Sequence, residues 1–268
     1  MAVTIKSKKE IELMREAGKM LEEVHNKLAD FIKAGKILER VHNELENALR
    51  PGMSTKDIDT LGEEIIRSYG CIPSFLNYNG YPASICVSVN DEVVHGIPRK
   101  DRILQDGDIV SLDAGLIHEG YHSDAARTHA VGNISEEAKR LIEVTKQSFF
   151  EGIKLAVPGN HLFDISEAIQ KYVESNGYSV VRDLVGHGIG THLHEDPQIP
   201  NFKQRRKGMK LRPGMTLAIE PMVNEGSYDV VWLDDDWTVV TEDGSLAAHY
   251  ENTIVITEDG CEILTLSE

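Results

Sequence analysis

Four acidic residues lie within apolar stretches of the sequence that are typical of β-strands. Asp113 closes the segment IVSLDAG, and Asp124 follows in YHSDAART, on the expected partner strand of a hairpin. Glu220 lies in LAIEP, and Glu251 lies in HYENTIVIT. A lone carboxylate in such a strand is costly to remove from water. The four acids together therefore indicate a bound cation.

The segment VGHGIGTHLHEDP adds histidines to these acids. Glycines flank His187 and leave its imidazole unobstructed, and His192 and His194 follow in the same loop. Carboxylates with imidazole and no thiolate match Mn²⁺, Fe²⁺ or Co²⁺, with Zn²⁺ as a further candidate. Because two of the carboxylates could bridge, the sequence suggests two divalent ions. Taken singly, a strand-end Asp is also a common turn former, and a lone His is a common structural residue.

A long repeat relates the two parts of the chain that carry these acids. PGMSTKDIDTLGEEIIRSYG, from Pro51, resembles PGNHLFDISEAIQKYVESNG, from Pro158, and DGDIVSLDAG aligns at the same offset with PGMTLAIEPM. The second alignment superposes Asp113 on Glu220. We therefore expect two halves, at about 51–157 and 158–268, related by a pseudo-two-fold axis with the metal site between them.

A second, tandem repeat precedes the first half. AGKMLEEVHNKL at 17–28 is followed by AGKILERVHNEL at 34–45, and both copies have helical apolar spacing. A continuous helix would rotate the apolar face of one copy by roughly 260° relative to the other. We therefore predict two helices at an angle, with a break near Gly35, in an N-terminal segment (1–50) before a catalytic domain (51–268).

The remaining elements are expected to alternate in blocks. Apolar periodicity predicts helices near 55–69, 135–155 and 163–176. The predicted strands lie near 84–89, 107–113, 122–131, 214–220, 228–233, 237–241 and 249–256. Short turns join several of these strands, which favours an α+β fold with an antiparallel sheet and helices on one face over a doubly wound parallel sheet.

Composition limits the partners and the compartment. The 268 residues carry 28 basic and 44 acidic side chains, a net charge of −16, which disfavours binding to DNA or to an anionic membrane. No apolar run approaches a membrane span, and the start MAVTIKSKKE lacks the apolar core of a signal peptide. Three cysteines without CxxC spacing indicate free thiols. We therefore expect a cytoplasmic protein.

The motifs VHGIP, SLDAG with HSDAART, GHGIGTHLHEDPQIP, LAIEPM and HYENTIVIT together resemble the type I methionine aminopeptidases of the bacterial kind. The resemblance covers nearly the whole chain. It implies the pita-bread fold, in which two α/β halves surround a dinuclear metal centre. It also implies removal of the N-terminal methionine from nascent polypeptides whose second residue is small.

The resemblance further implies a role for each metal ligand. Asp124 and Glu251 would bridge two ions, Asp113 would chelate one of them, and His187 with Glu220 would complete the other. A hydroxide that bridges the ions would attack the first peptide bond. Glu220 would also carry the proton to the leaving amine.

Two further histidines and an apolar pocket match the same family. His95 corresponds to a histidine near the scissile nitrogen, and His194 to one that donates to the carbonyl oxygen of the tetrahedral intermediate. The side chains that correspond to the lining of the methionine pocket are Tyr78, Tyr81, Cys86, Leu193 and Trp237. At Leu193 some family members carry an aromatic residue instead, so the pocket shape departs from theirs.

The sequence also leaves two other classes of protein open. An Xaa-Pro aminopeptidase or prolidase shares the catalytic half and the five ligands, but usually carries a large additional N-terminal domain. A catalytically inactive relative that binds peptides would typically have lost ligands. The basic segment 202–214, FKQRRKGMKLRPG, is either a solvated loop or a weak ribosome contact. A monomer is expected.

Overall fold

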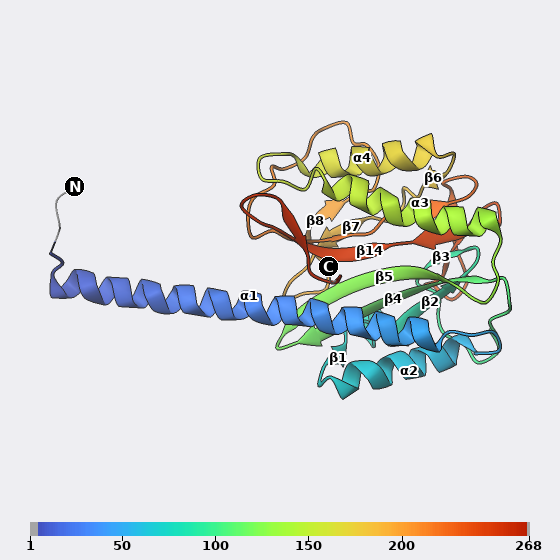
Figure 1. The fold of residues 1–268 in the computed structure, drawn as a ribbon, viewed down its shortest axis with the longest axis horizontal. Helices are drawn as coiled ribbons and strands as arrows, with labels where there is room; N and C mark the ends of the chain where they lie inside the picture. Colours follow the sequence, from blue (N-terminus) through green and yellow to red (C-terminus); the bar gives the residue numbers. More distant parts are fainter. Residues whose placement is uncertain (1–4, 267–268) are drawn as a thin grey trace.

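The structure, a computed structural model, describes residues 5–266, with the side chains of residues 21–28 outside that description. It consists of a curved sheet with helices around its outside and one long helix that extends away from the body (Figure 1). The helices are α1 (Lys8–Ala48), α2 (Thr55–Ser68), the short η1 (Tyr78–Gly80), α3 (Glu136–Ile153) and α4 (Leu162–Ser175). No helix in this described part is long and apolar enough to cross a bilayer.

In the described part of the chain, fifteen strands form one large sheet and two small ones. They are β1 (Ile72–Pro73), β2 (Ile85–Val89), β3 (Glu92–Val94), β4 (Ile109–His118), β5 (Tyr121–Ala130), β6 (Ser179–Val180), β7 (Gly186–Gly188), β8 (Glu195–Ile199), β9 (Thr216–Ile219), β10 (Met222–Asn224), β11 (Val230–Trp232), β12 (Val239–Thr241), β13 (Ala247–His249), β14 (Glu251–Ile256) and β15 (Cys261–Ile263). The large sheet has the order β1-β4-β5-β14-β9-β7-β8, with β2 also paired to β4 and β15 to β14. The small sheets are β13-β10-β6 and β11-β12-β3.

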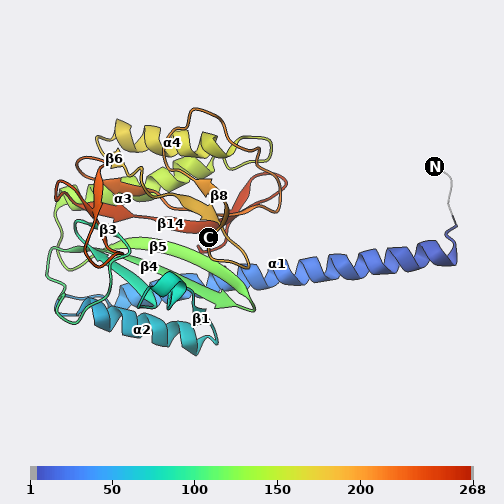
Figure 2. The ribbon, with the colours of Figure 1, turned by 180° about the vertical axis from the view of Figure 1, so that it is seen from behind.

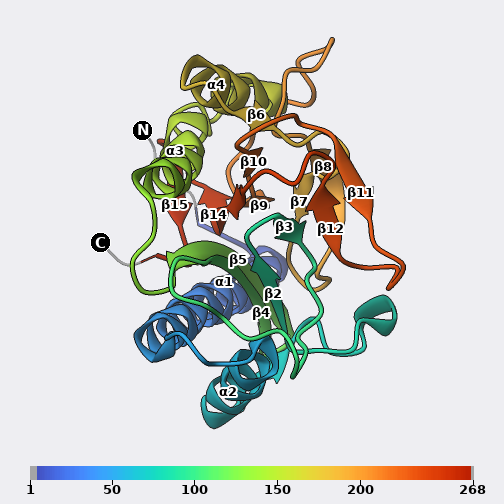
Figure 3. The same cartoon turned by 90° about the vertical axis from the view of Figure 1, so that its right-hand side faces the viewer.

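Every strand pair in the described residues is antiparallel, which confirms the α+β prediction. Helices α1 and α2 pack beside β4, β5 and β2, whereas α3 and α4 pack beside β13, β10 and β6. Figures 2 and 3 show both helix pairs on the outer side of the curved sheet. The apolar core accordingly lies in two main clusters, one under each helix pair.

The long repeat appears as two similar substructures. Helices α2 and α4 begin and end at the positions that the repeat superposes. The main-chain N–H of Ser54 donates to Asp57 at 2.9 Å, and that of His161 donates to Asp164 at 2.9 Å, so both helices begin with the same interaction. The two parts of the chain thus repeat the same helix with the same start, as the long repeat predicts.

Helix α3 also has a counterpart in the first half. The offset of the long repeat superposes α3 on 29–46, which is the second part of α1. This part of α1 buries Leu38, Val41 and Leu45 in the core under α1 and α2. The first half therefore uses the later tandem copy as its first helix, and the division of the chain at residue 50 stays a prediction.

The prediction of two angled helices in the tandem repeat is wrong, because α1 is one continuous helix of 41 residues. The sequence between the copies, ADFIK, contains neither proline nor glycine and does not interrupt a helix. Gly35 is not a break: a Cβ there would collide with the main-chain oxygen of Leu264, so glycine permits a close approach. The apolar faces of the two tandem copies need not align on the sheet, because residues 8–20 do not pack against it. Met14 is 61% exposed and Met20 is 66% exposed.

Candidate metal centre

The hairpin of β4 and β5 brings the first two acids together. Asp113 lies opposite Ala126 and Asp124 lies opposite Gly115, so the two carboxylates are diagonal neighbours on one face of the sheet. The sequence predicted a strand that ends at Asp113, but β4 continues to His118. Both acids consequently lie within paired strands rather than at a strand end.

The second half contributes three side chains through adjacent strands. Glu251 begins β14 and lies opposite Ala126 of β5, while the next residue of β14 pairs with the end of β9. Glu220 directly follows β9. His187, in β7, pairs with Ala218 of β9. The order β5-β14-β9-β7 therefore carries ligand-type residues from both halves to one place.

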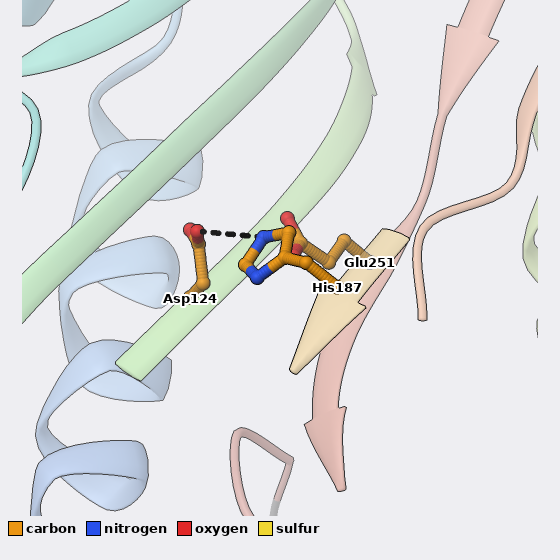
Figure 4. Close-up of side chains that lie close together, drawn as sticks. All are labelled: Asp124, His187 and Glu251. Atoms are coloured by element: carbon orange, nitrogen blue, oxygen red, sulfur yellow. Dashed lines mark ion pairs between the residues drawn. The ribbon is translucent and has the colours of Figure 1, made fainter. Parts of the chain in front are cut away.

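The donor atoms of three of these residues lie close enough to share a cation. Asp124, His187 and Glu251 each offer a ligand atom within 4.8 Å of the others, and Figure 4 shows these side chains converging from three strands. His187 Nε2 lies 3.9 Å from Asp124 Oδ2, the dashed contact in Figure 4, and 3.6 Å from Glu220 Oε1. These separations exceed hydrogen-bond distance and leave space for an ion among the donors.

The tautomer and the protonation state of His187 suit a metal ligand. Its Nδ1 donates to the main-chain oxygen of Gly188 at 2.9 Å, which places the ring proton on Nδ1 and leaves the Nε2 lone pair directed at the carboxylates. Burial and the neighbouring His194 lower the pKa of His187 to about 4. At neutral pH the ring is therefore uncharged and available for coordination.

The pKa values of the carboxyl groups are shifted in the opposite direction, upwards. Burial and mutual repulsion raise the pKa values of Asp113, Glu220 and Glu251 well above their usual range, and burial raises the pKa of Asp124 to about 7. One oxygen of each of Asp113, Asp124 and Glu251 is buried without a hydrogen-bond partner. Such unpaired oxygens fit divalent cations, which would supply both the missing partners and the missing positive charge.

All residues predicted for the site line one cavity of about 170 Å³. The cavity is lined by the five ligand candidates, by His95 and His194, by the five pocket residues, and by Phe75 and Asn79. Three of the pocket side chains, Tyr81, Cys86 and Leu193, are almost completely buried. The metal-ligand candidates and an apolar pocket thus share one space.

His194 and Tyr78 form a hydrogen-bonded pair at the cavity. The Tyr78 hydroxyl lies 2.7 Å from His194 Nδ1, and the His194 ring centroid lies 4.3 Å from that of His187. Burial lowers the pKa of His194 below its usual value, so the ring is uncharged at neutral pH. A hydroxyl that donates to Nδ1 leaves the ring proton on Nε2, where it is available to a substrate oxygen.

His95 and Trp237 both line the cavity, with their ring centroids 6.4 Å apart. His95 has a positive φ of 59°, an unfavourable conformation for a residue with a side chain, and such strain is concentrated at functional sites. Its pKa is lowered to about 4 by burial, with a smaller effect from His194. Trp237 packs edge-on against Tyr81, with the ring centroids 5.1 Å apart. The Tyr81 hydroxyl donates to the main-chain oxygen of Gly96 at 2.9 Å, which directs its apolar ring at the cavity.

Three residues at the site were not found from the sequence. Phe75 and Asn79 line the cavity, but they belong to a loop without periodicity. His249 is buried, its Nε2 lies 3.7 Å from Glu220 Oε2, and neither ring nitrogen has a hydrogen-bond partner. Its position just before Glu251, in an apolar strand segment, was a signal that could have identified it.

A duplicated, curved antiparallel sheet with buried carboxylates and an imidazole between its halves defines a metallopeptidase of the pita-bread fold. The model for metallopeptidase family M24 matches residues 12–258, and the chain belongs to this family. It is 56% identical to a methionine aminopeptidase of Clostridium acetobutylicum, over 99% of this chain and 100% of that protein. A methionine aminopeptidase structure from Thermotoga maritima superposes with a TM-score of 0.88 at 48% identity, covering 90% of this chain and 97% of that one.

The fold is also similar to that of proline-specific enzymes. An Xaa-Pro dipeptidase from Bacillus anthracis superposes with a TM-score of 0.74 at 24% identity. The superposition covers 91% of this chain and only 61% of that one. This similarity shows the shared fold alone.

Proposed function

We propose that the chain is a methionine aminopeptidase that hydrolyses the first peptide bond of a polypeptide when methionine is followed by a small residue. The main observation is that a full set of metal-ligand candidates and an apolar pocket lined by aromatic and sulfur-containing side chains share one cavity. A thioether gains dispersion energy from such a lining. Relatives named methionine aminopeptidases, more than 50% identical over almost the whole chain, support the same activity.

Two divalent ions of Mn, Fe, Co or Zn are proposed as cofactors. Asp124 and Glu251 would lie between the ions, Asp113 would bind one of them, and His187 with Glu220 would bind the other. The proximity of Asp124, His187 and Glu251 and the unpaired buried oxygens support this arrangement. When bound, the ions would polarise the scissile carbonyl and lower the pKa of a nucleophilic water.

The residues around this centre have distinct proposed roles. His194 donates its Nε2 proton to the developing oxyanion, and Tyr78 holds the required tautomer through the 2.7 Å hydrogen bond. His95 lies beside the leaving nitrogen. Glu220 accepts the proton of the attacking water and delivers it to the leaving amine, a role supported by its buried position against His187 and His249.

The pair of His194 and Tyr78 gives a graded prediction. His194→Ala should lower kcat for a Met-Ala-Ser peptide by about 10²-fold to 10³-fold, because an oxyanion donor is lost. Tyr78→Phe should lower it by only about tenfold, because the donor remains while its tautomer is no longer fixed. Steady-state kinetics measure both effects. Equal losses in the two variants would contradict the tautomer argument.

Arg127 is proposed as a positioning residue behind the metal centre. Its guanidinium donates to the main-chain oxygen of Glu251, to Asn252 Oδ1 at 2.5 Å and to the main-chain oxygen of Thr265 at 3.2 Å. It also lies 4.6 Å from the ring centroid of Tyr250. These contacts fix the start of β14, from which Glu251 reaches the site.

Arg127→Met should therefore weaken metal binding by about 10-fold to 100-fold, as loss of support behind a ligand typically does. Competition with a chromophoric chelator measures this affinity directly, independently of turnover. Arg140→Met is the matched control, because Arg140 stacks on Tyr178 at 5.9 Å and contacts none of the proposed ligands. Unchanged metal affinity in Arg127→Met would refute the positioning role.

A peptide panel tests the proposed specificity. Purified protein is stripped with a chelator, restored with one divalent metal at a time, and incubated with Met-Ala-Ser, Leu-Ala-Ser and a peptide that begins Ala-Pro. We expect metal-dependent release of methionine alone. Cleavage before proline would favour an Xaa-Pro aminopeptidase, and no turnover with any metal would favour a peptide-binding protein.

Nascent polypeptide N-termini are the proposed substrates. The cytoplasmic location, the monomeric state and the absence of DNA as a partner stay predictions. A weak ribosome contact through 202–214 also stays a prediction. Several basic side chains of this segment are exposed, although Lys203 is paired with Glu167 at 2.6 Å.

A further inference from the structure

Helix α1 contains a second version of its own core-packing segment. The packed part buries apolar side chains at Phe31, Ala34, Ile37, Leu38, Val41 and Leu45. At the positions that the tandem repeat superposes on these, the sequence has Met14, Ala17, Met20, Leu21, Val24 and Leu28. Every buried apolar position of the packed copy thus has an apolar counterpart in the outer copy, which lies farther from the sheet.

The two copies also share residues that only the packed position requires. Gly35 is needed because the main-chain oxygen of Leu264 leaves no space for a Cβ, whereas a Cβ at Gly18 would meet nothing within 4 Å. Glycine is less favourable than alanine in an exposed helix, and no contact among the described residues explains Gly18. Likewise, His42 Nε2 lies 2.8 Å from a main-chain oxygen of β5, and the sequence repeats this histidine as His25.

From these correspondences we propose that the outer copy, 14–28, is an alternative occupant of the surface that α1 covers, so that the helix exchanges register by the offset of the tandem repeat. This helix-binding surface comprises the buried side chains of Leu112, Leu116 and Ala125 and the main chain at Leu264. In the exchanged register the outer copy packs on this surface. The segment 32–48 then becomes a longer connection to α2, and the metal centre on the opposite side of the sheet is unchanged.

The observed register is the more stable of the two. Phe31 fills more space than its counterpart Met14, and Glu44 accepts a 2.8 Å hydrogen bond from Tyr69 that its counterpart Lys27 cannot accept. The exchanged register requires a longer connection, but the entropic cost of closing a loop rises only slowly with its length. The exchanged register is therefore a minor state of the unmodified chain, which substitutions in the packed copy would make dominant.

The test places charges in the packed copy. Leu38→Asp with Val41→Asp puts two carboxylates into the core in the observed register, which by itself would prevent folding. Because Leu21 and Val24 can replace the lost side chains, we expect this double variant to fold, with a cooperative thermal transition and no loss of specific activity. Adding Leu21→Asp and Val24→Asp should abolish folding, whereas these two changes alone should leave the thermal midpoint unchanged.

Limited proteolysis identifies the register directly. In the unmodified chain Lys33, Lys36 and Arg40 belong to the packed helix and should resist trypsin. In the Leu38→Asp, Val41→Asp variant they lie in the new connection and should be cut while the catalytic body stays intact by mass spectrometry. An unfolded double variant, a folded one still protected at these bonds, or a folded quadruple variant would each overturn the proposal. The folding and proteolysis readouts do not depend on the proposed enzymatic activity.

Discussion

Glu220→Gln is expected to lower kcat/KM for a Met-Ala-Ser peptide by about 10³-fold or more, because it removes both a proposed metal ligand and the proposed proton carrier. The amide has nearly the same shape as the carboxyl group, so the cavity should keep its form. The amide cannot accept the proton of a water molecule, and it binds divalent cations weakly. Steady-state kinetics at saturating metal measure the loss.

The matched control for this variant is Glu242→Gln. Glu242 is exposed and lies outside the cavity, so its replacement removes one negative charge without touching the site. Activity should remain within about twofold of the unmodified chain, as expected for a surface substitution. A Glu220→Gln variant that keeps more than about a tenth of the activity would contradict the role of Glu220 in proton transfer.

The metal-free protein should become less stable as the pH rises from about 7 to about 9, and divalent metal should reverse this loss. Burial raises the pKa of Asp124 to about 7 and those of Asp113, Glu220 and Glu251 well above their usual range. Unfolded carboxyl groups titrate near pH 4, and the buried histidines with lowered pKa values, such as His95 and His187, are uncharged in both states above about pH 7. Above that pH the raised pKa values of these carboxyl groups therefore make the folded metal-free chain bind more protons than the unfolded chain. Its free energy of unfolding therefore falls as the pH rises through the folded-state pKa values.

Bound cations change the sign of this effect because they stabilise the ionised carboxylates. At a free metal concentration 100 times the dissociation constant, binding contributes about 2.7 kcal/mol per site, which raises the melting temperature of a chain of this size by about 5–10 °C. Differential scanning calorimetry with and without metal at several pH values measures both effects. In the double variant Asp113→Asn, Glu251→Gln, the pH dependence of stability and the metal-induced shift of the melting temperature should both be smaller. A metal-free protein whose stability rises over this pH range would contradict the buried-carboxylate account.

Much of the site could be predicted because it depends on patterns that are local in sequence. A carboxylate within an apolar strand, such as Asp113, stands out without any structure, since its desolvation cost requires compensation. The hairpin that joins Asp113 to Asp124 follows from short-range strand alternation. The long repeat then predicted that Glu220 occupies the position in the second half that Asp113 occupies in the first.

Other features depend on contacts between distant residues and were missed or mispredicted. Gly35 suggested a helix break, but its purpose is the close approach of Leu264, near the other end of the sequence. His249 was missed because its significance lies in its distance from Glu220, which is set by the fold between β9 and β14. Phe75 was missed because it enters the cavity from an irregular loop.

Metal titration of the stripped protein, with methionine release from Met-Ala-Ser followed in the same samples, tests the central claim most directly. The account predicts no release without metal and recovery as Mn²⁺ or Co²⁺ is added. It also predicts no recovery in Asp124→Asn or Glu251→Gln at the metal concentrations that saturate the unmodified chain. Methionine release that persists after complete removal of metal, or that survives both substitutions, would contradict a metal centre built from these residues.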